Sequence, residues 1–171
     1  ENSIRLNNLI WFYNLHFDSI DIEEKQFLTN KIIYLSDLTN LFLEVHLNNN
    51  HTLIQSKNLL ISSLLFQNNK CSKNWQINSI KILTNCLNKQ ISEDGIHIER
   101  SSMYQKVIFS ELLELVIMLN NNKEFVDETF LKLLSSKIFL LSKYDDYMTY
   151  DKETFSLWGD GYVEDRLIRH V

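Results

Sequence analysis

The sequence predicts an all-α fold built from antiparallel helical hairpins. The 171 residues include no proline and only three glycines, and these are the residue types that break or loosen helix interiors. Apolar residues also recur every three or four positions over long stretches, which is the period of an amphipathic helix. At this length we expect one domain with a buried core.

Apolar spacing indicates six helical segments joined by short polar links. They cover residues 4–15, 23–47, 52–66, 73–91, 103–119 and 127–142. The first segment is rich in aromatic residues. Trp11, Phe12, Tyr13 and Phe17 lie in it or just after it, and we expect them in the core and not on a sugar-stacking platform.

The other segments differ in where their apolar residues lie. The third is apolar almost all round, as a helix buried between neighbours would be. Each of the remaining segments has one apolar stripe: Leu28, Ile32, Leu35, Leu38, Phe42 and Val45 in the second; Ile80, Leu83, Leu87 and Ile91 in the fourth; Ile108, Leu112, Leu115 and Leu119 in the fifth; Phe130, Leu133, Leu134, Ile138 and Leu141 in the sixth. Consecutive helices with short links pack antiparallel, and such hairpins can close part of a ring.

Two stretches interrupt the helical pattern. Residues 92–95 read Ser-Glu-Asp-Gly, a turn signal, and an alternating stretch at 96–100 is expected to be extended. From Tyr144 onward the chain is aromatic and acidic. We therefore expect a helical part at residues 1–143 and an irregular tail at residues 144–171.

Composition excludes several functions. The net charge is −5 and no Lys/Arg cluster occurs, which argues against nucleic-acid binding. No stretch of eighteen apolar residues occurs, so we expect no membrane span.

Cys71 and Cys86 lack metal-ligand spacing and are expected to act as small buried hydrophobes. Because the chain begins with Glu1, we expect it to be a piece of a longer protein.

The first candidate for chemistry is the pair Asn50 and His51, just before the third segment. Asparagine is a favoured N-cap, so Asn49 or Asn50 is expected to cap that helix. Helix N-termini carry partial positive charge and attract carboxylates. The alternative interpretation is a plain cap beside a surface histidine.

The second candidate is the run of residues 99–105, Glu-Arg-Ser-Ser-Met-Tyr-Gln. Ser102 with Gln105 matches a capping box, which would place Tyr104 in the first turn of the fifth helix. The alternative is a packed tyrosine beside a solvated Arg100. Two helix starts that carry an amide, an imidazole, a guanidinium and a phenol would concentrate positive potential in an acidic protein, as an anionic sugar requires.

These residues resemble motifs of the heparinase II/III-like and alginate lyase-like polysaccharide lyases. Residues 44–60, with Glu44, Asn50 and His51, resemble the family's E-x-H-x-x-x-N-H region. Residues 99–104 resemble its E-R-S-P-M-Y motif, with Ser102 in place of the proline, and Tyr104 follows Asn50 by 54 positions, a separation that suits the family. Residues 11–17 and 159–160 resemble segments near the start and end of its helical toroid.

The resemblance implies a fold and a reaction. Residues 1–143 would form part of an incomplete α/α toroid, and residues 144–171 would lead toward a missing C-terminal β-sandwich that supplies a further catalytic residue. The family cleaves uronic-acid polysaccharides by β-elimination, without a metal or another cofactor. It also implies a bacterial protein, periplasmic or secreted, although a cytoplasmic location stays open.

The resemblance also implies roles for particular residues. Asn50 and His51 would donate hydrogen bonds to the uronate carboxylate, and Tyr104 would be the base, the acid or both. Arg100 would bind the same carboxylate. Glu99 would orient His51 or Arg100, and His97 would line the cleft. The partner is an acidic polysaccharide, and residues 1–171 alone are expected to have little activity.

Three other functions stay open. The toroid could bind acidic polysaccharide or a partner without catalysis, or serve as a helical interaction scaffold. A hydrolase would need two carboxylates across a cleft, for which the sequence offers only Glu99 and Asp160. A lyase differs from a hydrolase because its unsaturated uronate product absorbs ultraviolet light.

Overall fold

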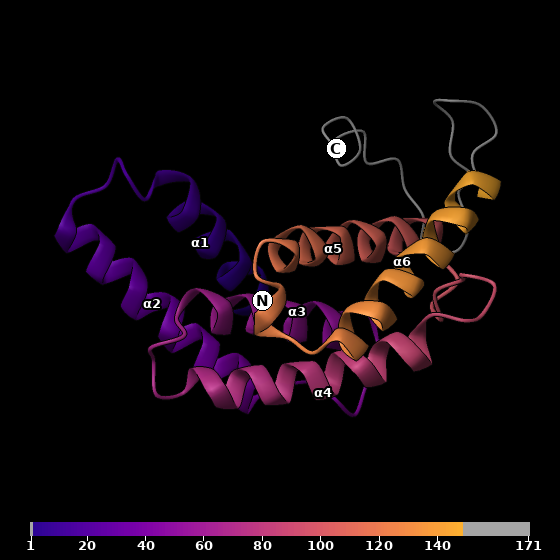
Figure 1. The fold of residues 1–171 in the computed structure, drawn as a ribbon, viewed down its shortest axis with the longest axis horizontal. Coiled ribbons are helices and arrows are strands. Elements are labelled where there is room, and N and C mark those ends of the chain that lie inside the picture. Colours follow the sequence, from indigo (N-terminus) through magenta and orange to yellow (C-terminus); the bar gives the residue numbers. More distant parts are fainter. Residues whose placement is uncertain (1, 149–171) are drawn as a thin grey trace. The chain divides into compact units, whose positions relative to one another are not determined.

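The computed structural model describes residues 2–148, with side chains up to Tyr144, and the regular structure in this part of the chain is helical (Figure 1). Each of the six predicted segments corresponds to one helix, so the all-α prediction is confirmed. The helices are α1 (Asn2–His16), α2 (Ile22–Leu41), α3 (Asn50–Leu65), α4 (Ser72–Gln90), α5 (Ser102–Asn120) and α6 (Glu128–Met148), with a short 3-10 helix, η1 (Lys123–Phe125), before α6. None of the described helices is long and apolar enough to cross a membrane.

The chain forms two compact units that divide between Cys86 and Leu87, inside α4. Unit 1 contains α1, α2, α3 and most of α4. Unit 2 contains the last residues of α4, then α5, η1 and α6. Each unit carries one of the two candidate motifs.

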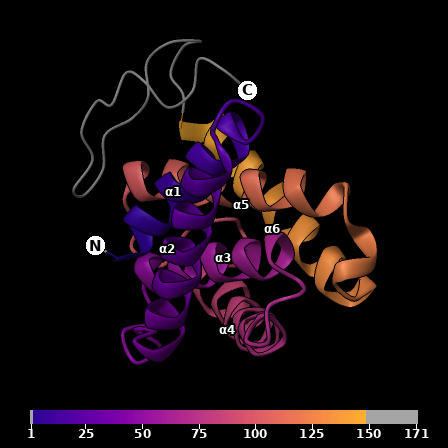
Figure 2. The ribbon, with the colours of Figure 1, turned by 90° about the vertical axis from the view of Figure 1, so that its left-hand side faces the viewer.

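In unit 1, α1 and α2 form a hairpin and lie side by side (Figure 2). The turn between them is short because α2 begins with a capping box. Asp21 Oδ1 accepts a hydrogen bond from the Glu24 amide at 2.8 Å, and Glu24 Oε2 accepts one from the Asp21 amide at 3.2 Å. These bonds satisfy two of the amide groups that a helix start leaves open.

Helix α3 contacts both helices of this hairpin. Twelve of its sixteen residues are buried, which confirms the prediction of a helix enclosed by neighbours. Polar groups also attach it to α1. The Asn58 side-chain amide donates to the carbonyl and the hydroxyl of Ser3, both at 3.0 Å, and the fully buried Lys57 donates to Asn7 Oδ1 at 3.3 Å. The first candidate pair therefore lies at the start of a helix that is well packed against its neighbours.

The prediction that the second helix continues to residue 47 is wrong, because α2 ends at Leu41. Side chains of α3 satisfy the backbone of the following loop. The Glu44 amide donates to Gln55 Oε1 at 3.0 Å, and the Glu44 carbonyl accepts from Thr52 Oγ1 at 2.8 Å. These bonds between separate parts of the chain replace the helical ones. Phe42 and Val45, predicted to face the core, are 69% and 45% exposed.

The expectation of a buried aromatic group is also wrong for most of its members. Trp11, Phe12 and Phe17 are 40%, 45% and 44% exposed. The Tyr13 ring packs against Phe17 and against Phe66, at the end of α3. Residues that are apolar by type thus lie on the surface of unit 1. The cysteine prediction holds for Cys86, which is buried, whereas Cys71 is half-buried, and neither forms a disulfide.

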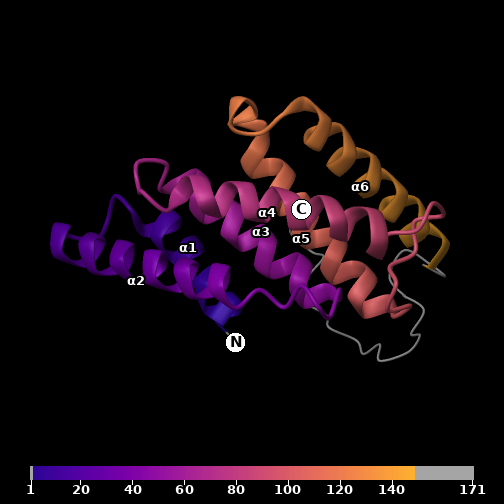
Figure 3. The same cartoon turned by 90° about the horizontal axis from the view of Figure 1, so that it is seen from below.

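In unit 2, α5 and α6 pack together, and α6 returns along α5 after η1 (Figure 3). The predicted stripe of α5 is buried: Ile108, Leu112, Leu115 and Leu119. In α6, Phe130, Leu134 and Leu141 are buried, whereas Leu133 and Ile138 of the predicted stripe are half-buried. Helix α6 continues past its predicted end at residue 142 to Met148, so the first residues assigned to the tail are helical. Residues 149–171, with Gly159 and Asp160, lie outside the described part of the chain.

Candidate functional site

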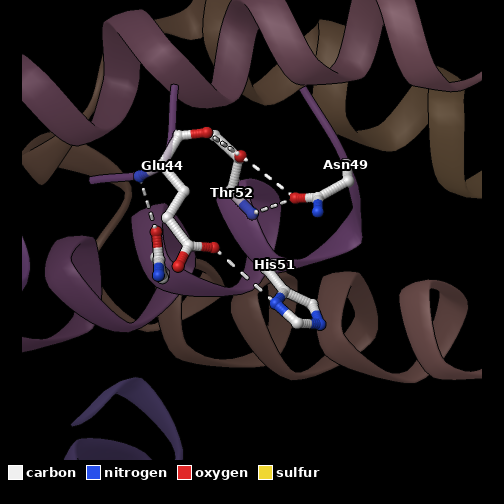
Figure 4. Close-up of polar contacts among 5 residues, drawn as sticks. Glu44, Asn49, His51 and Thr52 are labelled. Carbon is white, nitrogen blue, oxygen red and sulfur yellow. Dashed lines mark hydrogen bonds and ion pairs between the residues drawn. The ribbon is translucent and has the colours of Figure 1, made fainter. Parts of the chain in front are cut away.

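The start of α3 is organised by a side-chain cap (Figure 4). Asn49 is the N-cap residue, and its Oδ1 accepts a hydrogen bond from the Thr52 amide at 3.2 Å. The Thr52 hydroxyl lies 3.3 Å from the same oxygen and donates to the Glu44 carbonyl. This confirms the prediction that an asparagine caps this helix. The same contacts join the loop before α3 to its first turn.

Asn50 and His51 occupy the first turn of α3 in different surroundings. Asn50 is buried, with 5% of its surface exposed, whereas the side chain of His51 is 65% exposed. An exposed imidazole at a helix N-terminus can meet a ligand directly, and the partial positive charge of the helix favours an anion there. His51 is therefore the member of the pair that is open to solvent in this structure.

Glu44 lies beside His51, a contact that the sequence did not suggest. Its Oε2 is 3.7 Å from His51 Nδ1, so the two form an ion pair whenever the imidazole is protonated (Figure 4). That oxygen is shielded from solvent and accepts no hydrogen bond from the described residues. The resemblance implies that Glu99 orients His51 or Arg100, and within unit 1 the carboxylate that contacts His51 is that of Glu44.

The start of α5 differs from the predicted capping box. The N-cap residue is Ser101, and it makes no side-chain cap bond. Gln105, expected to bond back to the cap, reaches the preceding loop. Its Nε2 donates to the Gly95 carbonyl at 2.7 Å, and its Oε1 accepts from the His97 amide at 2.9 Å. The capping-box prediction is therefore wrong, but Tyr104 does lie in the first turn of α5, where it is half-buried.

The loop of residues 91–101 is anchored from several sides. Besides Gln105, Lys137 of α6 donates to the Ile91 carbonyl at 2.7 Å. The predicted extended stretch at 96–100 amounts to one bridge between Ile91 and His97. Arg100 then adopts a left-handed backbone conformation, with φ of 49°, which turns the chain into α5. These contacts determine where Arg100 lies relative to Tyr104.

His97 belongs to this anchoring. Its side chain is fully buried. Nδ1 accepts from the Glu99 amide at 3.4 Å, and Nε2 lies 3.2 Å from Gln90 Oε1. This pattern assigns the neutral tautomer with its proton on Nε2. Because both ring nitrogens have partners within unit 2, we infer a positioning role for His97. His97 is also among the residues that line the pocket described below, and its contact with substrate stays a prediction.

Burial makes His97 sensitive to acid. Desolvation of the imidazolium lowers the pKa of His97 from 6.5 to about 4. The unfolded chain binds this proton near pH 6.5 and the folded chain only near pH 4. Protonation of His97 therefore does not affect the free energy of unfolding above about pH 6.5, and it lowers that free energy as the pH falls from 6.5 toward 4. We expect unit 2 to lose about 3 kcal/mol over this range. Denaturant unfolding at several pH values should show a smaller decline in His97→Gln than in the wild type, and equal declines would contradict this account.

A pocket of about 490 Å³ lies beside the start of α5 in unit 2. Its lining includes Lys89, Asp94, Arg100, Ser101 and Tyr144, whereas Tyr104 is not among the lining residues. Asp94 accepts a hydrogen bond from the Ser92 hydroxyl, which lowers the pKa of its carboxyl. Glu99 is half-buried, and its amide donates to His97 Nδ1. Arg100 is exposed.

The predicted residues thus form two groups, one per unit. Asn50 and His51 lie at the start of α3, and Arg100 and Tyr104 lie at the start of α5. That the two groups meet at one sugar stays a prediction. Among the side chains that the structure describes, no cluster of three or more His, Cys, Asp or Glu could hold a metal ion.

Comparison with known proteins identifies the family. The model of the heparinase II/III N-terminus matches residues 1–166. The chain belongs to this family. A comparison with curated protein sequences finds no match.

Solved heparinases have the same fold as this member of the heparinase II/III N-terminus family. A crystal structure of heparinase III matches with a TM-score of 0.73 at 19% identity, over 89% of this chain and 23% of that one. The heparan sulfate lyase HepC from Pedobacter heparinus matches with a TM-score of 0.66 at 19% identity, over 96% of this chain and 25% of that one. The prediction of helical hairpins forming part of an α/α toroid is therefore confirmed. The chain spans about a quarter of the length of these structures.

Sequence reasoning missed three contributors to the two groups. Glu44 was assigned to the interior of a helix, although its position seven residues before His51 in the resemblance motif could have drawn attention to it. The sequence predicts a capping bond within α5 for Gln105 and suggests no role for Gln90. The partners of both glutamines are set by the folding of the 91–101 loop, for which the sequence carries only the turn signal at Gly95.

Proposed function

We propose that this chain is part of a polysaccharide lyase that cleaves a uronic-acid-containing polysaccharide by β-elimination. The observation that carries the proposal is the placement of both motifs in the first turn of a long helix: Asn50 and His51 in α3, and Tyr104 in α5. Helix starts attract anions, and these side chains are the donors and the proton carrier that such a reaction needs. Membership of the heparinase II/III N-terminus family supports the same reaction.

In this proposal each residue acts on one sugar ring. The C5 proton beside a charged carboxylate is very weakly acidic, so negative charge must be stabilised as the proton leaves. Hydrogen bonds from Asn50 and His51 to the carboxylate supply that stabilisation, and one such donor contributes roughly 3 kcal/mol in comparable oxyanion sites. Tyr104 takes the C5 proton, the C4–O bond breaks and a C4=C5 double bond forms, and Tyr104 then returns that proton to the departing oxygen. Glu44 orients His51 through its 3.7 Å contact.

The names of the structural relatives suggest a substrate class. These proteins are a heparinase and a heparan sulfate lyase, so we propose heparan sulfate as the first polymer to test, with alginate as the second. The chain corresponds to about a quarter of those proteins, and we propose that a C-terminal β-sandwich completes the site.

The test is to incubate the full-length protein with heparan sulfate and with alginate and to follow ultraviolet absorbance. We expect an unsaturated product from one of them, because β-elimination leaves a double bond conjugated with the carboxylate. Reducing ends that form without a rise in absorbance would indicate a hydrolase. Saturable binding of the polymer without cleavage would favour a non-catalytic binding domain, and both results would contradict the proposal.

A further inference from the structure

We infer that the pocket beside the start of α5 is a subsite for an oxyanion, a carboxylate or a sulfate, carried by an acidic sugar. The pocket measures about 490 Å³, a volume that suits a small ligand group or one sugar ring. Tyr104 is not among its lining residues, so it is separate from the proton carrier of the proposed reaction. The identity of the ligand as a sugar rests on the proposed function, whereas the site itself does not.

The first observation is an unsatisfied hydroxyl. Ser101 lines the pocket and is 4% exposed. Its Oγ is shielded from solvent and has no hydrogen-bond partner among the described residues. A buried polar group without a partner destabilises a folded protein by about 1–3 kcal/mol, so native proteins rarely keep one without a reason. An anionic oxygen in the pocket would accept the hydrogen bond that Ser101 does not make within the fold.

The second observation is the charge around this hydroxyl. Lys89 and Arg100 line the pocket, and the charge of Arg100 also acts on the Asp94 carboxylate, whose pKa it helps to lower. Asp94 is the carboxylate among the described lining residues, and the Ser92 hydroxyl already bonds to it. His97 is neutral above about pH 4. The two cations and the start of α5 therefore outweigh one engaged carboxylate, and the local potential favours an anion.

This arrangement gives Arg100 a different role from the one its motif suggested. Arg100 would bind a second charged group and not the carboxylate at Asn50 and His51. The pocket would then recognise a charged group other than the carboxylate of the ring that reacts. Arg100 and Ser101 are then specificity-determining residues.

The test uses Ser101→Ala in the full-length protein, because the two explanations of this serine predict different combinations of results. If Ser101 serves a ligand, removing its hydroxyl should leave the unliganded protein at least as stable as the wild type, since an unsatisfied buried group is lost. The affinity for the anion should fall about tenfold or more. Ser136→Ala, at an exposed position of α6, is the matched control and should change neither property.

Sodium sulfate and sodium glucuronate are the two probes, titrated calorimetrically against sodium chloride at equal ionic strength. Titration is preferable to thermal shift because sulfate also stabilises folded proteins by exclusion from their surface. Tighter binding of sulfate would indicate a sulfated sugar, and tighter binding of glucuronate would indicate a uronate. Arg100→Gln removes an exposed charge without disturbing the core, and it should also lower the affinity for the anion that binds more tightly.

The inference fails if the wild type binds neither anion saturably, or if Ser101→Ala binds both as the wild type does. It also fails if Ser101→Ala lowers the stability of the unliganded protein, because the hydroxyl would then have an internal partner. These outcomes are separable from the lyase proposal. If anion binding depends on Ser101 but no unsaturated product forms, only the lyase proposal is contradicted. If an unsaturated product forms but anion binding does not depend on Ser101, only the inference about the pocket is contradicted.

Discussion

Tyr104→Phe should lower kcat for β-elimination by about a thousandfold while KM changes little. Phenylalanine keeps the ring that packs in the first turn of α5 but removes the hydroxyl that would carry the proton. General acid–base groups typically contribute about 10²–10⁴-fold to such steps, and a loss of about a thousandfold lies within that range. The measurement is the initial rate of ultraviolet absorbance with the full-length protein and saturating polymer.

Tyr34→Phe is the matched control for this substitution. Tyr34 lies on α2 and is 59% exposed, so loss of its hydroxyl should leave both kinetic constants unchanged. A Tyr104→Phe protein that keeps more than a tenth of the wild-type kcat would remove Tyr104 from the chemical step. A rise in KM at constant kcat would indicate that Tyr104 binds substrate and does not carry the proton.

Gly95→Ala should cause the largest loss of stability in unit 2, roughly 2–5 kcal/mol from backbone strain and overpacking together. Gly95 has φ of +86°, and a Cβ placed there would lie 2.1 Å from the carbonyl oxygen of Leu140 and 2.6 Å from its carbonyl carbon. Both atoms belong to the backbone of α6, which cannot move aside without disturbing the helix. Denaturant unfolding of the wild type and the variant would measure the difference.

The Gly95 substitution should also affect the site, because the Gly95 carbonyl accepts the hydrogen bond from Gln105. Displacement of this turn would release the loop that positions Arg100. Glu93→Ala is the control, since Glu93 is an exposed residue of the same turn and should change stability by less than about 0.5 kcal/mol. A Gly95→Ala protein as stable as this control would contradict the prediction, because the backbone of α6 at Leu140 could then move to accommodate the Cβ.

The features predicted correctly depend on residues close together in the chain. The six helices follow from an apolar period that each segment carries within itself, and the cap of α3 follows from Asn49 and the amide of Thr52, three residues later. Burial of α3 on nearly all sides follows from its own composition. Tyr104 lies in the first turn of α5 because the apolar period begins there, even though the expected capping box does not form.

The features predicted wrongly depend on groups that compete from elsewhere in the fold. The apolar stripe favours continuation of α2 beyond Leu41, but the α3 side chains of Gln55 and Thr52 bond to the backbone of Glu44 and end it. Gln105 has a suitable donor in its own helix start, the backbone amide of the predicted cap residue, yet it bonds to the backbone of Gly95 and His97. In both cases hydrogen bonds across a loop replace the local alternative, and spacing along a sequence carries no information about them.

The same distinction applies to the chemistry. Residue types and spacing were sufficient to propose Asn50, His51, Arg100 and Tyr104, because the chemistry of an amide, an imidazole, a guanidinium or a phenol belongs to the residue type itself. Their roles stay predictions. The partner of His51, the protonation of His97 and the unsatisfied hydroxyl of Ser101 emerged only once the chain was folded. Each of these depends on desolvation and on the distance to a group contributed by another turn of the chain, and folding alone creates both.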